Sequence, residues 1–408
     1  HKIRNPDAEI TQLCKRFATR HRLLLTGAPI QNKLTELWSL FDFVMPGKLG
    51  AMPTFEEQFA LPIAQGTYAN ASEFSVQAAC SCSMILRDVI RPYLLRRLKN
   101  DVRIKLPDKT ETVLFCYLTE LQRQAYEDIL SSELATSVLA NRTAVFPLLT
   151  SLQKVCNHPH LVTWTANAAS PPHDESWGDW RLSGKLRVLK AVLRVWYAEG
   201  HRVAIFCQTR QMLDVVECFV RSRYNYQRLD GTTPVARRLG LIDRFNADAD
   251  IFAFLLTTRA GGLGINLTGA NRVVIVDPDW NPANDLQARE RAWRVGQTRD
   301  VAVYRLITGG TIEEKVFQRQ VFKQALSNRV LTEKTSSNRI LKRSDLRDLL
   351  AYPAPPEEAA GRAGGGDDSW TEKSYDAVTR DIVSRAEAAA EQAADAKAVA
   401  KAAAAAEK

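Results

Sequence analysis

Short apolar runs alternate with longer amphipathic segments between residues 200 and 310. Four of these runs are continuously apolar rather than alternating, namely Arg202–Cys207, Phe252–Leu256, Arg272–Val276 and Val301–Leu306. Continuous runs are typical of strands buried on both faces, and the intervening segments are long enough for crossover helices. The pattern therefore predicts an α/β fold with a parallel, doubly wound sheet, whose ligands would bind beyond the carboxyl ends of the strands.

A second sheet is predicted near the N-terminus. Arg22–Thr26 has the pattern of another buried strand and is followed by a Gly-Ala-Pro turn. Apolar side chains then recur at helical spacing from Leu34 to Val44. We interpret residues 1 to about 50 as the end of a separate sheet domain. Residues 50 to 110 are predicted to be mainly helical, and their basic run from Arg87 onward is explained equally well by DNA or lobe packing and by a solvated face.

The pattern changes again towards the C-terminus. Thr311-Ile312-Glu313-Glu314 has the spacing of a capping box and predicts the start of a helix. Proline and glycine clusters follow residue 350, and the chain from Ala386 on is mostly alanine with scattered charge. Because this last segment has no apolar face, we expect it to be solvated or disordered.

Length and charge narrow the possible classes of protein. A chain of 408 residues predicts two or three domains, and its net charge of +9 favours a polyanion such as nucleic acid. On charge alone, an ordinary basic enzyme is an equally good interpretation. No run reaches the roughly 18 apolar residues of a membrane span, and no secretory signal is apparent. Seven scattered cysteines suit reduced, mostly buried thiols in an intracellular protein.

The most specific chemical pattern is the arginine-rich stretch Gln287–Gln297. On a helix, Gln287, Arg291 and Arg294 would share one face because they are spaced i, i+4 and i+7. Two guanidiniums at the edge of a parallel sheet suit a polyphosphate, since each can bind phosphate oxygens through two hydrogen bonds. From charge alone a solvated basic helix would be favoured, but the surrounding motifs reverse that preference.

Three further motifs follow predicted strands. The glycine-rich stretch Thr257–Leu267 would let the backbone approach a phosphate closely. Leu25–Asn32 and Phe206–Asp214 each place short polar side chains where a strand meets a helix N-terminus, which suits anions.

Taken in their order along the chain, the four blocks resemble the third to sixth motifs of superfamily-two helicase motors of the Swi/Snf type. His1–Pro6 resembles the tail of the family's Asp-Glu-x-His box, and further family blocks are Tyr93–Arg97, Cys156–Pro159, Ser183–Leu186 and Asp230–Thr233. The resemblance covers about residues 1–350. It implies two RecA-like lobes with parallel sheets and helical insertions, with lobe one truncated at its N-terminus.

The resemblance also implies a division of the chain. Residues 1–110 would form the C-terminal part of lobe one with a helical protrusion, and 111–185 the inter-lobe linker and the start of lobe two. Residues 186–350 would form lobe two with a brace helix, and 351–408 a Pro/Gly linker and an Ala-rich tail.

Roles of single residues are carried over from the family. Arg291 and Arg294 match its arginine fingers, Gly262 and Gly264 line its nucleotide side, and Gln297 lies close by. The residues that match its DNA-backbone contacts are Thr209, Arg210 and Arg259. The residues that match its inter-lobe coupling motif are Thr26, Gly27, Gln31 and Asn32. Ala28 departs from the usual threonine of that motif.

Less generic stretches, such as Pro46–Gly50, Tyr68–Ser72, Asp277–Pro282 and Phe322–Leu331, fit one subgroup of the family. That subgroup implies an ATP-dependent translocase on double-stranded DNA, active in transcription-coupled repair at stalled RNA polymerase II in the nucleus. A nucleosome remodeller and a non-catalytic DNA- or polymerase-binding module are the alternatives.

The implied cofactors are ATP and magnesium. The chain contains no Gly-Lys-Thr phosphate loop, and no acidic pair precedes His1. We therefore expect this chain to lack appreciable ATP hydrolysis by itself, whereas the full-length protein would hydrolyse ATP. Cys156, His158 and His160 are spaced like metal ligands, but no fourth ligand lies near them in the sequence, so no metal site is predicted.

Overall fold

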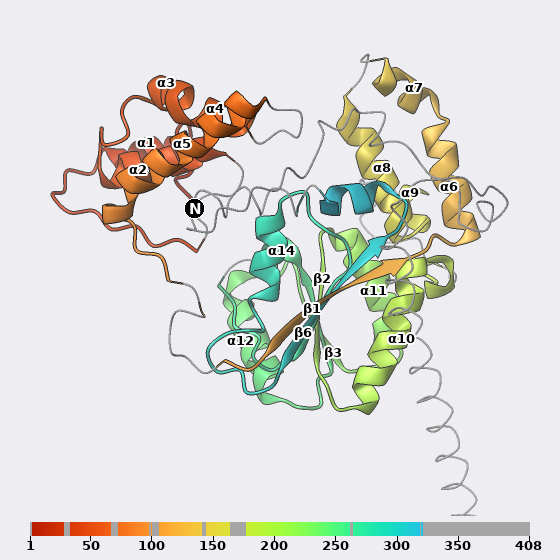
Figure 1. Cartoon of the computed structure of the whole chain (residues 1–408). Helices are drawn as coiled ribbons and strands as arrows, with labels where there is room; N and C mark the ends of the chain where they lie inside the picture. Colours follow the sequence, from red (N-terminus) through yellow and green to blue (C-terminus); the bar gives the residue numbers. More distant parts are fainter. Residues whose placement is uncertain are drawn as a thin grey trace, which may run out of the picture. The chain divides into compact units, whose positions relative to one another are not determined.

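The computed structural model of the chain describes residues 2–27, 33–66, 72–97, 99, 106–140, 144–163, 177–261, 264–318 and 320. Two compact units are present, one built mainly from residues before Arg103 and the other mainly from residues after Ile104 (Figure 1). Among the described residues, no helix is both long and apolar enough to cross a membrane.

The second unit contains a parallel sheet of six strands in the order β1-β6-β5-β2-β4-β3. In chain order the strands are β1 Lys109–Cys116, β2 Val203–Cys207, β3 Tyr226–Leu229, β4 Ala253–Thr257, β5 Arg272–Ile275 and β6 Val301–Thr308. The four strands predicted from apolar runs are therefore confirmed as β2, β4, β5 and β6. The parallel, doubly wound fold is confirmed as well.

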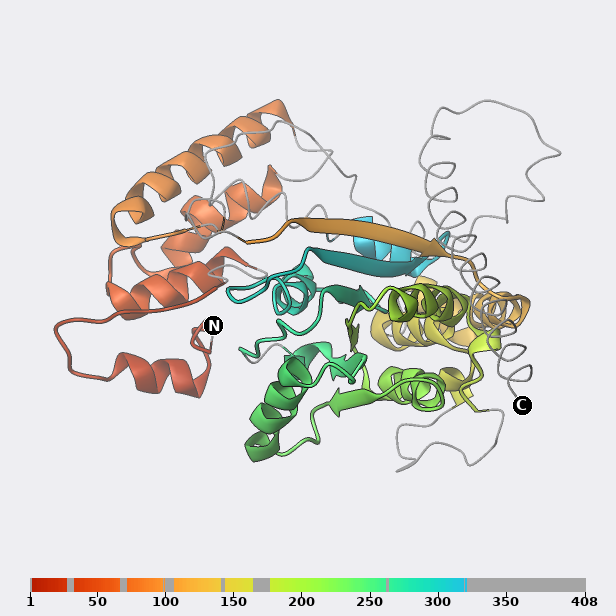
Figure 2. The same cartoon turned by 90° about the horizontal axis from the view of Figure 1, so that it is seen from below.

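Both edge strands, β1 and β3, were missed by the apolar-run pattern. β1 pairs with β6 along its whole length, from Lys109 opposite Val301 to Cys116 opposite Thr308 (Figure 2). Its first half is polar and partly exposed, and β3 alternates between half-buried and buried positions. An edge strand has one neighbour and more solvent contact, so it carries a weaker apolar signal than a central strand.

Helices cover both faces of this sheet. α10 (Gly184–Ala198) and α11 (Arg210–Arg221) pack on one face, where Val203 and Ile205 of β2 point. α12 (Val235–Ala247) and α14 (Pro282–Arg289) pack on the other face, against Ala204 and Phe206. Successive side chains of a strand point to opposite faces, which explains why a continuously apolar run such as Val203–Cys207 supplies both cores.

A helical segment connects β1 to α10. It consists of α6 Glu120–Leu130, α7 Glu133–Leu139, α8 Val145–Asn157, α9 His160–Thr163 and the 3-10 turn η4 Trp180–Leu182. α6 begins with a full capping box, in which Thr119 and Gln122 cap each other's backbone. The same segment brings Asn157 and Ser183 to the start of α10, where the Ser183 hydroxyl donates to the Asn157 carbonyl at 2.6 Å.

The described part of the first unit is helical. Its elements are α1 Glu9–Lys15, α2 Leu34–Val44, α3 Met52–Phe55, the π-helix η1 Glu56–Ala60, α4 Leu61–Gln65, α5 Glu73–Ile90 and η2 Arg91–Tyr93. The helix predicted from Leu34 to Val44 and the mainly helical character after residue 50 are thus confirmed. The core of this unit joins Leu37, Trp38 and Phe41 of α2 to Phe55 and Leu86.

The strand predicted at Arg22–Thr26 is wrong. Residues 21–26 form no regular element, and Leu23 and Leu25 are 84% and 87% exposed. A strand needs a neighbour that takes its backbone hydrogen bonds, and the described residues of this unit offer none. The segment is attached instead through the Arg22 guanidinium, which donates to the carbonyls of Phe43 at 2.8 Å and Phe17 at 2.7 Å.

The helix predicted at Thr311 begins at residue 312, but its capping differs from the predicted box. The Thr311 hydroxyl accepts from the Glu313 amide at 3.3 Å, and the Glu314 carboxylate accepts from the Gly310 amide at 2.8 Å. Phe322–Leu331, most of Tyr68–Ser72 and the predicted linker and tail at 351–408 lie outside the described residues.

Candidate functional site

The loops that follow β2 and β4 lie next to each other at the carboxyl edge of the sheet. The two strands end in register, with Cys207 opposite Thr257. The Thr258 hydroxyl donates to the Cys207 carbonyl at 3.2 Å and joins the two loops. This arrangement brings the predicted DNA-contacting residues after β2 and after β4 to one edge.

Thr209 and Arg210 form the start of α11. The Thr209 side chain caps the helix by accepting from the Met212 amide at 3.2 Å, and Arg210 is its first residue. Thr209 and Arg210 are exposed, and so is Arg259 in the short helix α13 (Thr258–Gly261) after β4. Two exposed guanidiniums beside a capped helix N-terminus can bind anions such as backbone phosphates.

Asp277 connects this edge to the protein core. Its buried carboxylate accepts from the Gln208 amide at 2.9 Å, directly before Thr209, and from the Asn157 side chain at 3.4 Å. Burial raises the pKa of Asp277 to about 6, and the nearby Lys185 ammonium opposes that shift. The buried Asp277 carboxylate therefore fixes the position of the loop that carries Thr209.

The glycine-rich loop after β4 is described from Gly264 onward. Gly264 is exposed and has a φ of +69°, with open space where a Cβ would lie, so its backbone conformation rather than crowding favours glycine. Gly262 lies outside the described residues. Further along, Asn246 clasps the loop through the Asn266 carbonyl and the Gly269 amide, each at 2.9 Å.

Arg291 and Arg294 do not lie on one helix with Gln287, which corrects the prediction of a shared helical face. α14 ends at Arg289, and both arginines lie in the turns that follow. The carbonyls of Arg291 and Ala292 accept from the Leu267 amide at 3.0 Å and from the Gln297 side chain at 3.0 Å. These two bonds hold the turns that follow α14 against the glycine-rich loop and against Gln297.

The hydrogen bond from the Leu267 amide to the Arg291 carbonyl joins Arg291 to the glycine-rich loop, because Leu267 is the last residue of that motif. Arg291 is half-buried and Arg294 is exposed. Burial, and then the neighbouring Arg294 guanidinium, lower the pKa of Arg291 from its ordinary value. A polyanion bound by both guanidiniums would relieve this repulsion.

The turn that carries these arginines is mounted on the start of β1. The Trp293 indole donates to the Pro107 carbonyl at 2.8 Å, and the Lys109 ammonium lies 4.6 Å from the Trp293 ring centroid. Lys109 also pairs with Glu290 at 3.2 Å, and Arg289 pairs with Glu111. Trp293 is thus a packing residue that braces the arginine turn.

Gln297, which was expected close to the nucleotide side, is bonded to the backbone around it. Its side-chain amide donates to the carbonyls of Thr268 at 3.2 Å, Ala270 at 2.9 Å and Ala292 at 3.0 Å. Its oxygen accepts from the amides of Thr298 and Arg299, both at 3.0 Å. The hydrogen-bonding capacity of this buried side chain is therefore used by the backbone around it.

Of the four predicted coupling residues, Gln31 and Asn32 lie outside the described residues, as does Ala28. Thr26 and Gly27 lie at the end of the exposed segment of the first unit, and no atom comes within 4 Å of a Cβ built on Gly27.

A buried ionic cluster behind the carboxyl edge was not predicted. The Lys185 ammonium bonds to Glu313 at 2.6 Å, to Asn157 at 2.8 Å and to the Val276 carbonyl at 2.9 Å. The motifs that contain these residues are recognisable in the sequence, but their contact across as many as 128 residues is not. The Lys185 side chain is completely buried, so it does not bind phosphate from solvent.

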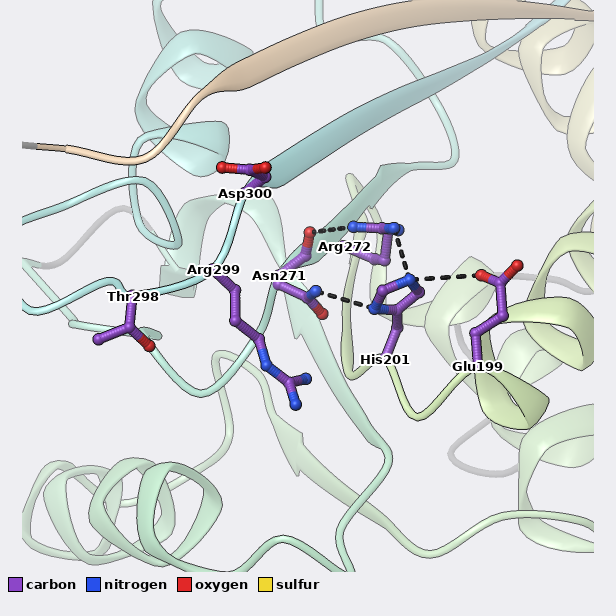
Figure 3. A pocket seen from close by; sticks show the side chains of 7 residues that line it. All are labelled: Glu199, His201, Asn271, Arg272, Thr298, Arg299 and Asp300. Atoms are coloured by element: carbon purple, nitrogen blue, oxygen red, sulfur yellow. Dashed lines mark hydrogen bonds and ion pairs between the residues drawn. The ribbon is translucent and has the colours of Figure 1, made fainter.

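A cavity of about 510 Å³ lies at the opposite, amino edge of the sheet (Figure 3). His201 and Asn271 line it just before β2 and β5, and Arg299 and Asp300 line it just before β6. The His201 ring contacts Asn271 at 2.9 Å, Arg272 at 2.6 Å and Glu199 at 3.3 Å. This mixed-charge cavity contains none of the predicted site residues.

Within the described residues, no group of three or more His, Cys, Asp and Glu side chains could hold a metal ion. Cys156 is buried, and burial raises the pKa of its thiol. His158 uses both ring nitrogens, towards the Asp179 carbonyl at 3.0 Å and the His160 amide at 3.2 Å. These contacts give the Cys-Asn-His-Pro block a structural role.

Two protein-family models match the chain. The model of the SNF2-related domain matches residues 1–161, and that of the helicase conserved C-terminal domain matches residues 184–296. The second match contains β2 to β5 and both loops of the carboxyl edge.

Curated relatives of high identity include three repair and remodelling proteins. The human DNA excision repair protein ERCC-6 is 51% identical over 388 residues, which cover 92% of this chain and 26% of the human protein. The rice DNA excision repair protein CSB is 54% identical over 352 residues, which cover 86% of this chain and 29% of the rice protein. The Arabidopsis thaliana Protein CHROMATIN REMODELING 8 is 54% identical over 352 residues, also covering 86% and 29%. The chain thus spans less than a third of the length of these relatives.

Proposed function

Because the chain belongs to the Swi/Snf family of ATPases, in the subgroup of the Cockayne syndrome group B protein (CSB), we propose that it works as part of a translocase on double-stranded DNA. In this proposal the second unit is the second motor lobe. The main support is that the loops after β2 and β4 meet at one edge of the sheet. The loop after β4 is also hydrogen-bonded to the turn that carries Arg291 and Arg294.

The DNA-binding part of the proposal rests on Thr209, Arg210 and Arg259. All three are exposed at the carboxyl edge, and the helix N-terminus under Arg210 adds partial positive charge. Groups of this kind bind backbone phosphates and do not read bases. We therefore expect binding that is independent of sequence and strongly weakened by salt.

The nucleotide part rests on Arg291, Arg294 and the glycine-rich loop. The hydrogen bond from Leu267 to Arg291 makes the loop and the arginine turn one structural piece, so both would respond together to a bound polyphosphate. ATP would supply the phosphates, and the guanidiniums would neutralise charge that develops during phosphoryl transfer. No magnesium ligand is assigned to the described residues.

For the whole protein, we propose transcription-coupled DNA repair at stalled RNA polymerase II in the nucleus. The names of the human and rice relatives, which are excision repair proteins, support this role. Nucleosome remodelling is the second candidate, and the name of the Arabidopsis relative favours it. Nucleosomes would then join DNA and the polymerase as partners.

ATP hydrolysis by the complete product of the gene, with and without duplex DNA, tests the motor function. DNA should stimulate turnover, and Arg291→Ala or Arg294→Ala should reduce it by about 10³-fold or more while DNA binding persists. Arg299→Ala, at the opposite edge of the sheet, is the matched control and should retain most activity. A protein that binds DNA but never turns over ATP would instead be a non-catalytic binding module.

The 408-residue chain should show no appreciable DNA-stimulated turnover, because it contains no phosphate-loop sequence. A nucleosome-sliding assay with the complete gene product separates the two roles. Sliding comparable to that of a dedicated remodeller would favour the second candidate.

A further inference from the structure

Five basic residues form a group beside Trp180. Arg181 and Lys190 lie over its ring, and Arg187 bonds to Arg181. Arg194 and Arg223 lie near Lys190 and Tyr224. Arg181 comes from η4, Arg187, Lys190 and Arg194 from α10, and Arg223 from the loop after α11. The inner face of α10 is apolar and buried in the core, so the basic side chains occupy its other face. We call this group the α10 basic cluster.

The cluster is organised by neutral partners. The Lys190 ammonium lies 3.3 Å from the centroid of the Trp180 ring, and the Arg181 guanidinium lies 5.1 Å from it. Arg187 Nε donates to the Arg181 carbonyl at 2.9 Å. Arg223 donates to the Phe219 carbonyl at 3.4 Å. Carbonyls and an indole ring orient these cations without neutralising them.

Little negative charge compensates the cluster. Among the described residues, Asp179 is the one carboxylate that pairs with it, at 3.5 Å from Arg181. Burial lowers the pKa of Lys190, and Arg223, Arg181 and Arg194 lower it further. The positive charges therefore repel one another, and a bound polyanion would relieve that repulsion.

The composition and spacing of the cluster favour a nucleic-acid backbone. Four of its five cations are arginines, whose planar groups bind phosphate oxygens in pairs. Arg187 and Arg194 are seven residues apart on α10, which is about 10.5 Å along the helix axis. That length corresponds to about three base-pair steps along the duplex axis, at a rise of roughly 3.4 Å per phosphate of one strand. Because Lys190 covers the Trp180 ring, the ring is not open for stacking on a base.

The cluster is separate from the predicted DNA contacts of the motor. Arg210 begins α11 at the carboxyl edge of the sheet, and Arg223 follows the other end of the same 12-residue helix. A helix of that length spans about 18 Å. A phosphate bound by Arg210 and a phosphate bound by Arg223 would therefore be different phosphates.

We propose that the α10 basic cluster is a second nucleic-acid contact, which holds the phosphate backbone of duplex DNA away from the edge formed by Thr209, Arg210 and Arg259. The contact goes beyond the proposed motor function and needs no ATP. It would bind one length of the duplex while the carboxyl edge of the sheet binds another.

A matched pair of double variants tests the proposal. Arg187→Glu with Arg194→Glu reverses two exposed charges on α10. Arg237→Glu with Arg244→Glu makes the same change in charge at the same spacing on α12, which covers the opposite face of the sheet. Affinity for a labelled 40-base-pair duplex is measured by fluorescence anisotropy over a range of salt concentrations, in the complete gene product without nucleotide.

The α10 double variant should lose at least about tenfold in affinity at low salt. The slope of log affinity against log salt should become shallower by about two, one unit for each lost phosphate contact. The α12 double variant should keep the wild-type slope. Equal losses in both variants would mean that only net charge matters and would overturn the proposal, as would unchanged binding in the α10 variant.

Two further measurements separate a loss of phosphate contacts from damage to the fold or to the motor. Arg187→Gln with Arg194→Gln removes the charges without reversing them and should give an intermediate loss, with thermal unfolding reporting any damage to the fold. At saturating DNA, the α10 variants should retain DNA-stimulated ATP turnover. If the wild-type protein lacks turnover altogether, the motor proposal fails, but the binding comparison still decides the role of the cluster.

Discussion

The ammonium of Lys185 lies 2.6 Å from the carboxylate of Glu313, and both side chains are completely buried. Asn157 and the Val276 carbonyl complete the bonds of the ammonium. The pair joins the first turn of α10 to the helix that begins at residue 312. Burial alone would lower the pKa of Lys185, but Glu313 and Asp277 raise it above its ordinary value, so the ion pair persists at neutral pH.

Removing one member of this pair should destabilise the protein strongly. Lys185→Ala leaves the Glu313 charge buried and unpaired, and we expect the free energy of unfolding to fall by about 3–5 kcal/mol. Urea denaturation of the 408-residue chain measures it. Lys185→Met combined with Glu313→Leu should be less destabilised than Lys185→Ala, because Glu313 is then not left as an unpaired buried charge.

The exposed pair of Arg123 and Glu120 on α6 is the control, since Glu120→Gln should change stability by less than about 1 kcal/mol. A loss below about 1 kcal/mol in Lys185→Ala would mean that water reaches the Glu313 site.

Acid should weaken the fold through His158. Burial, and the nearby His160 ring, hold the pKa of His158 at about 4, below its ordinary value of 6.5, although the Asp179 carbonyl partly opposes the shift. The unfolded chain therefore takes up a proton first, and stability that is present above pH 6.5 is lost as the pH falls towards 4. The shift corresponds to roughly 3 kcal/mol.

Urea denaturation at pH 7 and pH 4.5 measures this loss. His158→Phe should be less stable than wild type at neutral pH but should lose less between the two pH values. His21→Gln, at an exposed position, should keep the wild-type dependence. The same pH dependence in wild type and His158→Phe would contradict the assignment.

Gln297→Ala should loosen the loop between β4 and β5. The variant leaves the carbonyls of Thr268, Ala270 and Ala292 without their donor, and buried groups without partners cost about 1–3 kcal/mol. Amide hydrogen exchange should quicken around Thr268 and Arg299, and thermal unfolding should shift down. Gln297→Glu should be at least as damaging, because its carboxylate would face three carbonyl oxygens. Unchanged exchange in both variants would count against the structural role.

Trp293 should matter for turnover more than for binding, if the motor function holds. Trp293→Ala removes the indole bond to Pro107 and the ring beneath Lys109, so the turn with Arg291 and Arg294 loses its brace. A misplacement of about 1 Å can slow a reaction by about 100-fold, so we expect a drop in kcat of about 10- to 100-fold.

The KM for ATP and the Kd for DNA should change little in Trp293→Ala. Trp196→Phe, on the other face of the sheet, is the control for general damage to the core. A variant with normal kcat and weakened DNA binding would instead make Trp293 a nucleic-acid contact.

The central strands were predictable because their signal is local. β2, β4 and β5 are buried on both faces, so their sequences are continuously apolar whatever lies beside them. The same pattern misled at Arg22–Thr26, where apolar residues form no strand because no described neighbour pairs with them. β1 was missed because its first half is polar. That half forms a strand because β6 supplies its backbone hydrogen bonds.

From the sequence by itself came the family, the parallel sheet and the positions of Thr209, Arg210 and Arg259 at strand ends, because motif order and strand periodicity are written in neighbouring residues. Tertiary structure alone decided the contacts between distant segments. The pair of Lys185 and Glu313 joins residues 128 positions apart. Gln297 is fully engaged only because the chain folds back on it, and the Arg291 carbonyl is bonded only because the fold brings Leu267 beside it. Such contacts depend on which segments the fold brings together, and no local pattern encodes that.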